Sequence, residues 1–285
     1  MNFIVGVALL AVVTAVACAL PGVFVVLRKD SMLVDAISHA VLPGIVVGYA
    51  ITHALDSPLL VVGAAAAGLL VVLGSEYLGR TGLLTGDAPQ GLIFPALFSV
   101  GVIMVSQSFG SVHLDTHAVL VGDLNLAAFA QLEIGRVSLG PQYLYVMGGV
   151  LLLNALFIWA LLPKLQVATF DPAAAAALGI RVRLLNTGLM FLVAVTVTAA
   201  FNAAGAVLVL ALVVVPAATA HLFTQRLGPL LFWTVVIAAG GALGGFGVAY
   251  VVNAATSAAM AVSYGVLFLV VLLGVRVRVA RTSGA

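Results

Sequence analysis

Charge is the first thing that this sequence lacks. Only 7% of its 285 residues are charged and 64% are apolar, whereas about a quarter of the residues of an ordinary soluble domain are charged. A chain this poor in charge cannot cover a water-facing surface, so we expect lipid to be its main solvent. The formal net charge of +2 also argues against a nucleic-acid partner, because such a partner requires a clustered basic face.

Cysteine and the common catalytic motifs are also missing. Cys18 is the single cysteine, which excludes a disulfide framework or a cysteine-rich metal site. The only lysines are Lys29 and Lys164, and neither follows a glycine, so no phosphate-binding P-loop is present. No His-Glu-x-x-His or Gly-x-Ser-x-Gly stretch occurs either. We therefore expect that this chain is not an enzyme and holds no permanent cofactor.

Long apolar runs are what the sequence has instead. A helix needs about 20 apolar residues to cross the bilayer core, and on that criterion the chain contains about nine spans. Residues 2–27 have no basic leader and exceed the core of a signal peptide, so they are predicted to be the first span. The sequence predicts an all-α integral membrane protein with one transmembrane domain, 1–285. The predicted spans are 2–27, 31–55, 58–78, 89–109, 141–162, 184–201, 203–223, 229–252 and 257–275.

Basic residues near the span ends predict the orientation. With the N-terminus outside, nearly every basic residue falls on the inner side, and only Arg136 remains outside. The N-terminus is therefore predicted outside and the C-terminus inside. The basic residues that this orientation places inside are Arg28, Lys29, Arg80, Lys164, Arg181, Arg183, Arg226, Arg276, Arg278 and Arg281.

Glycine and proline suggest where helices pack or bend. Gly240 and Gly244, and likewise Gly241 and Gly245, are four apart, a spacing that lets a neighbouring backbone approach closely. Three other glycine and proline positions are candidate helix breaks, because proline removes a backbone hydrogen-bond donor and glycine permits unusual backbone angles. They are Pro43, Gly44 and Pro216.

Asp35 and His39 are the first candidate site. They are four residues apart in a predicted span, so they project from one helix face. Ionisable residues inside a membrane usually face a cavity or a partner, and carboxylate with imidazole suits Mn²⁺, Fe²⁺ or Zn²⁺. The alternative is an Asp–His hydrogen bond between packed helices. Two ligands are too few for a closed site, although a symmetric dimer would supply four.

The outer loop, about 110–140, holds a second group of metal-compatible donors. These are His113, Asp115 and His117. They are a candidate outer mouth for metal, although such residues are also common in solvated loops.

Four stretches, in order along the chain, resemble the permease family of ABC importers for manganese, zinc and iron. They are LVDAISHAVLPGIVVG (33–48), GDAPQGLIFPALFSVGVIM (86–104), FDPAAAAALGI (170–180) and VVVPAATAHLFTQRLG (213–228). The second keeps the family's pattern at Asp87, Gly91 and Phe94. Two positions depart from it: Val34 replaces a usual glycine, and the segment around Asp115 has an atypical interior.

The resemblance implies a multi-pass permease in the cell membrane of a prokaryote. Such permeases form homodimers, are driven by two copies of a cytoplasmic ATPase, and receive metal from an extracytoplasmic binding protein. The resemblance assigns the metal contacts to Asp35 and His39. It also implies a cytoplasmic coupling helix, about 168–180, that contacts the ATPase through Phe170, Asp171, Pro172, Leu178, Gly179 and Ile180. Leu-Pro-Gly after His39 favours manganese over zinc or iron.

Three other functions stay open at this level. One is an ABC permease for a metal chelate or a cobalamin-like cargo, and another is a secondary metal carrier that works without ATP. The third is a membrane-embedded enzyme that uses a metal-activated water. The coupling-helix segment counts against the second, because a carrier without an ATPase has no need of it. The missing hydrolase motifs count against the third.

Overall fold

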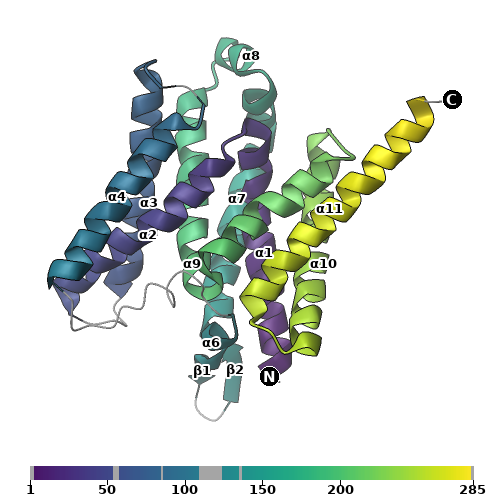
Figure 1. The fold of residues 1–285 in the computed structure, drawn as a ribbon. Helices are drawn as coiled ribbons and strands as arrows, with labels where there is room; N and C mark the ends of the chain where they lie inside the picture. Colours follow the sequence, from purple (N-terminus) through teal and green to yellow (C-terminus); the bar gives the residue numbers. More distant parts are fainter. Residues whose placement is uncertain (1–2, 54–57, 85, 109–123, 135–136, 284–285) are drawn as a thin grey trace.

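The computed structural model describes residues 3–53, 58–84, 86–108, 124–134 and 137–283. It is a bundle of long helices with the N-terminus at one end and the C-terminus at the other (Figure 1). The long helices are α1 (Phe3–Arg28), α2 (Ser31–Thr52), α3 (Pro58–Arg80), α4 (Ala88–Ser108), α7 (Gln142–Phe170), α9 (Val182–His221), α10 (Leu227–Val252) and α11 (Thr256–Ser283). The short elements are α6 (Leu124–Phe129), α8 (Pro172–Ala177), β1 (Gln131–Ile134) and β2 (Val137–Pro141).

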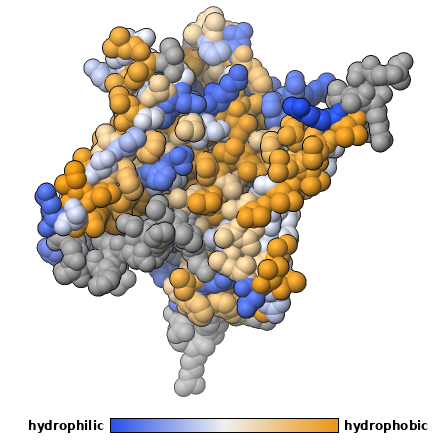
Figure 2. All heavy atoms as spheres, in the orientation of Figure 1, coloured by the Kyte–Doolittle hydropathy of each residue, from blue (hydrophilic) through white to orange (hydrophobic). Residues whose placement is uncertain are grey.

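The long helices have the length and apolar composition of membrane-spanning segments. In the described part of the chain, eight helices are long and apolar enough to cross a membrane. Apolar side chains cover long stretches of the face seen in Figure 2, including the surface over α4 and α11. The expectation of an all-α integral membrane protein is therefore confirmed.

The sixth and seventh predicted spans lie together in α9, which has 40 residues. A straight helix of that length would measure about 60 Å, twice the thickness of the hydrocarbon core. Gly205 interrupts it with φ 77° and ψ 165°, a conformation that glycine adopts without strain. Figure 1 shows that α9 turns partway along its length and runs back toward the end at which it begins.

Contacts with α1 support this reversal. Thr196 lies at the level of Ala17, because Asn154 donates hydrogen bonds to both. Seventeen residues later, Val213 packs against Gly22, which is nearer the Arg28 end of α1. A straight helix would instead have carried Val213 about 25 Å onward. An odd number of crossings agrees with termini at opposite ends of the bundle, and the exact count of nine stays a prediction.

Helices α1, α2 and α9 form the buried centre of the described bundle. Small residues allow backbones to approach where lipid provides no hydrophobic force between helices. A Cβ on Gly22 would lie 2.0 Å from the Val213 carbonyl oxygen, and one on Gly44 would lie 2.3 Å from the Gly63 carbonyl oxygen. These two positions therefore fix how α1 meets α9 and how α2 meets α3.

The proposed break at Pro43 and Gly44 is not observed. Helix α2 runs through both residues, and α9 runs through Pro216 and is interrupted at Gly205 instead. Proline is tolerated inside membrane helices because packing against neighbours compensates for the lost hydrogen bond. Gly44 serves close packing against Gly63, and a Cβ on Gly101 of α4 would lie 3.0 Å from Pro43.

A small assembly of short elements lies at the end of the bundle that carries the N-terminus (Figure 1). Strands β1 and β2 pair antiparallel, with Ile134 opposite Val137. The short α6 is tied to α11, since the Asn125 amide donates to the Thr256 hydroxyl over 2.9 Å. The sequence analysis did not predict this hairpin.

Candidate functional site: an Asp–His pair and an inner polar cavity

Asp35 and His39 are half-buried and lie along the side of α2 that is left exposed, here called the exposed stripe. The helix buries most of its surface, and its exposed residues are Met32, Val47, Ala50 and Ile51. The His39 Nε2 and Asp35 Oδ1 atoms are 3.6 Å apart, and about a third of each side chain is exposed, 31% and 33%. The predicted shared face is therefore present, and it is open on the single chain.

Two aromatic rings of α4 cover one side of this pair. The His39 ring stacks on Phe94 with centroids 5.4 Å apart, and it meets Phe98 edge-on at 5.8 Å. Phe94 belongs to the stretch of α4 in which the family resemblance was noted. The rings restrict the orientation of the imidazole and exclude water on that side, and its Nε2 faces the Asp35 carboxylate.

The pair supplies one oxygen and one nitrogen donor. No group of three or more His, Cys, Asp or Glu side chains that could hold a metal occurs among the described residues. A metal at this site would therefore need water or donors from another chain to complete four or more ligands. His113, Asp115 and His117, the candidate outer mouth, lie outside the described residues.

The candidate coupling segment forms a short helix with a well-defined start and end. The Asp171 carboxylate accepts a hydrogen bond from the Ala174 amide over 2.9 Å, and Pro172 occupies the first turn. At the other end Gly179 has φ 75°, and the Ile180 amide donates to the Ala175 carbonyl over 3.0 Å. The helix is shorter than the predicted 168–180, because α7 continues through Phe170.

Helix α8 projects from the end of the bundle opposite the N-terminus (Figure 1). Its flanking apolar side chains are exposed, with Phe170 at 54% and Leu178 at 71%. Exposed apolar residues at the edge of a membrane protein mark either a protein contact or the headgroup region.

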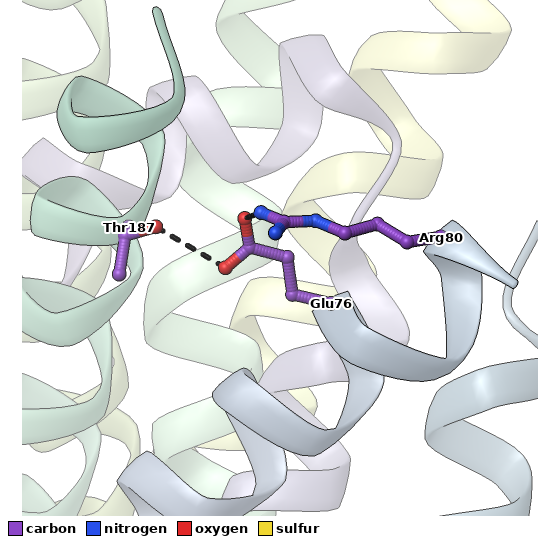
Figure 3. A network of polar contacts seen from close by, with 3 residues as sticks. All are labelled: Glu76, Arg80 and Thr187. Carbon is purple, nitrogen blue, oxygen red and sulfur yellow. Dashed lines mark hydrogen bonds and ion pairs between the residues drawn. The ribbon is translucent and has the colours of Figure 1, made fainter.

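A polar group that was not predicted from the sequence lies at the same end of the bundle. Glu76 of α3 pairs with Arg80 of the same helix, and its second carboxylate oxygen accepts a hydrogen bond from the Thr187 hydroxyl of α9 over 3.1 Å (Figure 3). The three side chains thus connect α3 to the start of α9. The only signal in the sequence was the spacing of Glu76 and Arg80, four residues apart at the end of the predicted span 58–78.

A cavity of about 250 Å³ lies beside this bridge, and we call it the α8-end cavity. Its polar lining comes from four helices and the α1–α2 turn, and it consists of Arg28, Asp30, Ser75, Glu76, Gln90, Asn186 and Thr187. Burial raises the pKa of the Asp30 carboxyl; the Arg28 guanidinium lowers this pKa in part, and the Asp87 carboxylate raises it.

Fold and composition together define a multi-pass membrane protein. The model of the family described as ABC 3 transport family matches residues 1–274. The chain belongs to this family of ABC transporters. It is a multi-pass protein of the prokaryotic cell membrane, as the resemblance implied.

Similar proteins agree with this assignment. The chain is 44% identical over 271 residues to the zinc transport system membrane protein TroD of Treponema pallidum, covering 94% of this chain and 72% of that protein. It is 38% identical to the manganese transport system membrane protein MntD of Bacillus subtilis, covering 90% and 87%. Among solved structures, PsaBC from Streptococcus pneumoniae in complex with Fab matches with a TM-score of 0.77 and 25% identity, covering 95% and 91%.

Proposed function

We propose that this chain is the membrane-spanning subunit of an ATP-driven importer that moves a divalent transition metal into the cytoplasm. Manganese is the favoured cargo, and zinc and iron are the alternatives. The observation that carries the proposal is the Asp35–His39 pair, an ionisable pair on the exposed stripe of an otherwise buried membrane helix. Transfer of ionisable side chains into lipid costs free energy, so residues of this kind usually face a partner or a transported ion.

A second copy of the chain would complete the metal site. The exposed third of Asp35 and of His39 leaves both side chains accessible to another α2, and two pairs would offer two carboxylates and two imidazoles. Mixed oxygen and nitrogen donors suit Mn²⁺, Zn²⁺ and Fe²⁺. The names of similar proteins specify zinc and manganese transport systems, which supports this range of cargo.

Partners follow from the family and from α8. We propose two copies of a cytoplasmic ATPase, which contact α8 and its flanking residues Phe170 and Leu178, and an extracytoplasmic protein that delivers the metal. Because α8 leads directly into α9, a displacement of α8 would be transmitted to the centre of the bundle. Alternating access then needs no chemistry on the metal, and a sparse, partly hydrated site releases its ion readily.

The test is isotope uptake by cells that carry this chain together with its ATPase and binding protein. Manganese, zinc and iron are compared for the wild type, Asp35→Ala and His39→Ala, with His53→Ala as a control because His53 lies at the far end of α2. We expect both site variants to abolish uptake of one metal at normal expression, and His53→Ala to keep it. Uptake that survives Asp35→Ala and His39→Ala would contradict the proposal.

A further inference from the structure

The α8-end cavity contains buried polar atoms that the described chain leaves without partners. Ser75 Oγ, Gln90 Oε1, Asn186 Oδ1 and Arg28 Nη1 all face no hydrogen-bonding group of the described residues. Ser75 and Gln90 are only 7% and 8% exposed. An unsatisfied buried polar group costs about 1–3 kcal/mol, so four of them around one cavity indicate a polar occupant.

The lining favours an occupant that donates hydrogen bonds. Of the four atoms, the Gln90 and Asn186 oxygens are acceptors, the Ser75 hydroxyl can accept, and only the Arg28 nitrogen is an obligate donor. Two carboxylates, Asp30 and Glu76, add further acceptors. A hydrated cation meets this lining, because the water molecules around it direct their hydrogens outward. An anion would face both carboxylates.

Each carboxylate of the cavity has an arginine next to it in this structure. Arg28 lies beside Asp30, and Arg80 pairs with Glu76 (Figure 3). The Arg80 side chain is 40% exposed, so its guanidinium can turn to water and release the carboxylate. The volume is sufficient for several waters, because one water needs about 10–15 Å³ of cavity volume and the cavity has about 250 Å³.

The cavity is linked to the Asp–His pair through α4. Gln90 and Phe94 are four residues apart on α4, so they share a helix face. Phe94 stacks on His39, and Gln90 lines the cavity one turn nearer the α8 end. Under the predicted orientation, this is the cytoplasmic side of the pair.

We propose that the α8-end cavity is a second cation site, which takes a hydrated divalent metal through the Glu76 carboxylate and the oxygens of Gln90 and Asn186. In this proposal, which rests on the proposed function for the direction of travel, an ion leaving Asp35 and His39 pauses here before it enters the cytoplasm. Arg80 competes with the ion for Glu76. Thr187 holds the second carboxylate oxygen, so the cavity keeps its shape while the partner of Glu76 changes.

Manganese binding to the purified transporter tests this, with Mn²⁺ alone as the probe and free Mn²⁺ measured by electron paramagnetic resonance. All variants carry Asp35→Ala and His39→Ala, so the first site is removed. We expect residual Mn²⁺ binding in this background. Glu76→Gln should weaken it by about 10- to 100-fold, the usual effect of losing an outer-sphere partner.

Arg80→Gln gives the decisive contrast. It should strengthen Mn²⁺ binding by about two- to fivefold, the factor that a partly exposed ion pair is worth. Arg276→Gln, which removes an exposed positive charge from α11, should leave the affinity unchanged and so controls for net charge. Gln90→Leu should weaken binding in the same direction as Glu76→Gln, and it replaces that variant if Glu76→Gln fails to fold.

Three results would overturn the second site: no Mn²⁺ binding in the Asp35→Ala, His39→Ala background, an Arg80→Gln variant that binds less tightly, or stabilisation by inorganic phosphate instead of Mn²⁺. Failure of the proposed function is recognised separately, as uptake that persists in the single variants Asp35→Ala and His39→Ala. The two outcomes are therefore distinguishable.

Discussion

At the scale of single residues, Asn154 shows how polar groups stabilise the apolar bundle. Its amide donates to the Ala17 carbonyl over 2.8 Å and to the Thr196 hydroxyl over 2.9 Å, which joins α7 to α1 and α9. Asn154→Leu keeps the size and removes both bonds. We expect it to lower the free energy of unfolding by about 1–2 kcal/mol, the range for hydrogen bonds between membrane helices.

The measurement is the thermal midpoint of the purified protein in detergent. Thr196→Ser keeps a hydroxyl at the same position and should stay close to the wild type, whereas Thr196→Val should destabilise in the same direction as Asn154→Leu. An Asn154→Leu protein as stable as the wild type would mean that packing alone determines the contact between α7 and its neighbours.

Single residues also mark the limit of what could be predicted from the sequence. Asp35 and His39 were found because ionisable side chains stand out within an apolar run and four residues define a shared helix face. The bridge from Glu76 to Thr187 joins positions 111 apart in the chain. Only the packing of α3 against α9 brings them together, and no local pattern encodes that packing.

At the scale of helices, only some of the closely spaced glycines of α10 contact a neighbouring helix. A Cβ on Gly245 would lie 2.8 Å from the Met260 Cα of α11, whereas one on Gly244 would meet nothing within 4 Å. Gly245→Ala should therefore push α10 from α11 and lower stability by about 1–3 kcal/mol, the usual cost of overpacking. Gly244→Ala should change it by less than about 0.5 kcal/mol.

Both alanine variants gain the same helix propensity, so their difference isolates the contact between α10 and α11. Thermal unfolding in detergent provides the comparison. Equal midpoints for the two variants would show that α11 moves aside without cost, which would contradict the close approach at Met260.

The sequence predicted these elements better than their bends. The sequence predicted the coupling helix over about 168–180; it is observed over 172–177, with Asp171 as its N-cap and Gly179 in a left-handed conformation after its end. Pro43 and Pro216 were expected to break helices, but neither does. The sequence placed the boundary between the two apolar runs at residue 202, inside neither span, whereas α9 is interrupted at Gly205; the reversal depends on how the following residues pack against α1.

At the scale of the whole molecule, the distribution of charge predicts which end of the bundle faces the cytoplasm. Arg28, Arg80 and Arg181 all lie at or next to the α8 end, where α1 and α3 end and α9 begins. Positive residues are retained on the cytoplasmic side, so α8 is expected to be inside. In that orientation α8 would lie within reach of the proposed cytoplasmic ATPase.

Cysteine labelling in intact cells tests this orientation together with the number of crossings. Because Cys18 is the single native cysteine, a Cys18→Ala background leaves only the introduced thiol: Ala173→Cys on α8, Gln225→Cys after α9, or Asn253→Cys between α10 and α11. A maleimide reagent that cannot cross the membrane should label Asn253→Cys from outside. It should label Ala173→Cys and Gln225→Cys only after permeabilisation.

The side from which Gln225→Cys is labelled decides how many times the chain crosses the membrane. If α9 turns back at Gly205, residues 173 and 225 lie on the same side and the chain crosses nine times, because two halves of about 20 residues each match the bilayer thickness. If α9 crossed once, Gln225→Cys would be labelled from the side opposite Ala173→Cys. Labelling of Ala173→Cys in intact cells would instead reverse the whole orientation, and it would remove α8 from the side on which ATP is available.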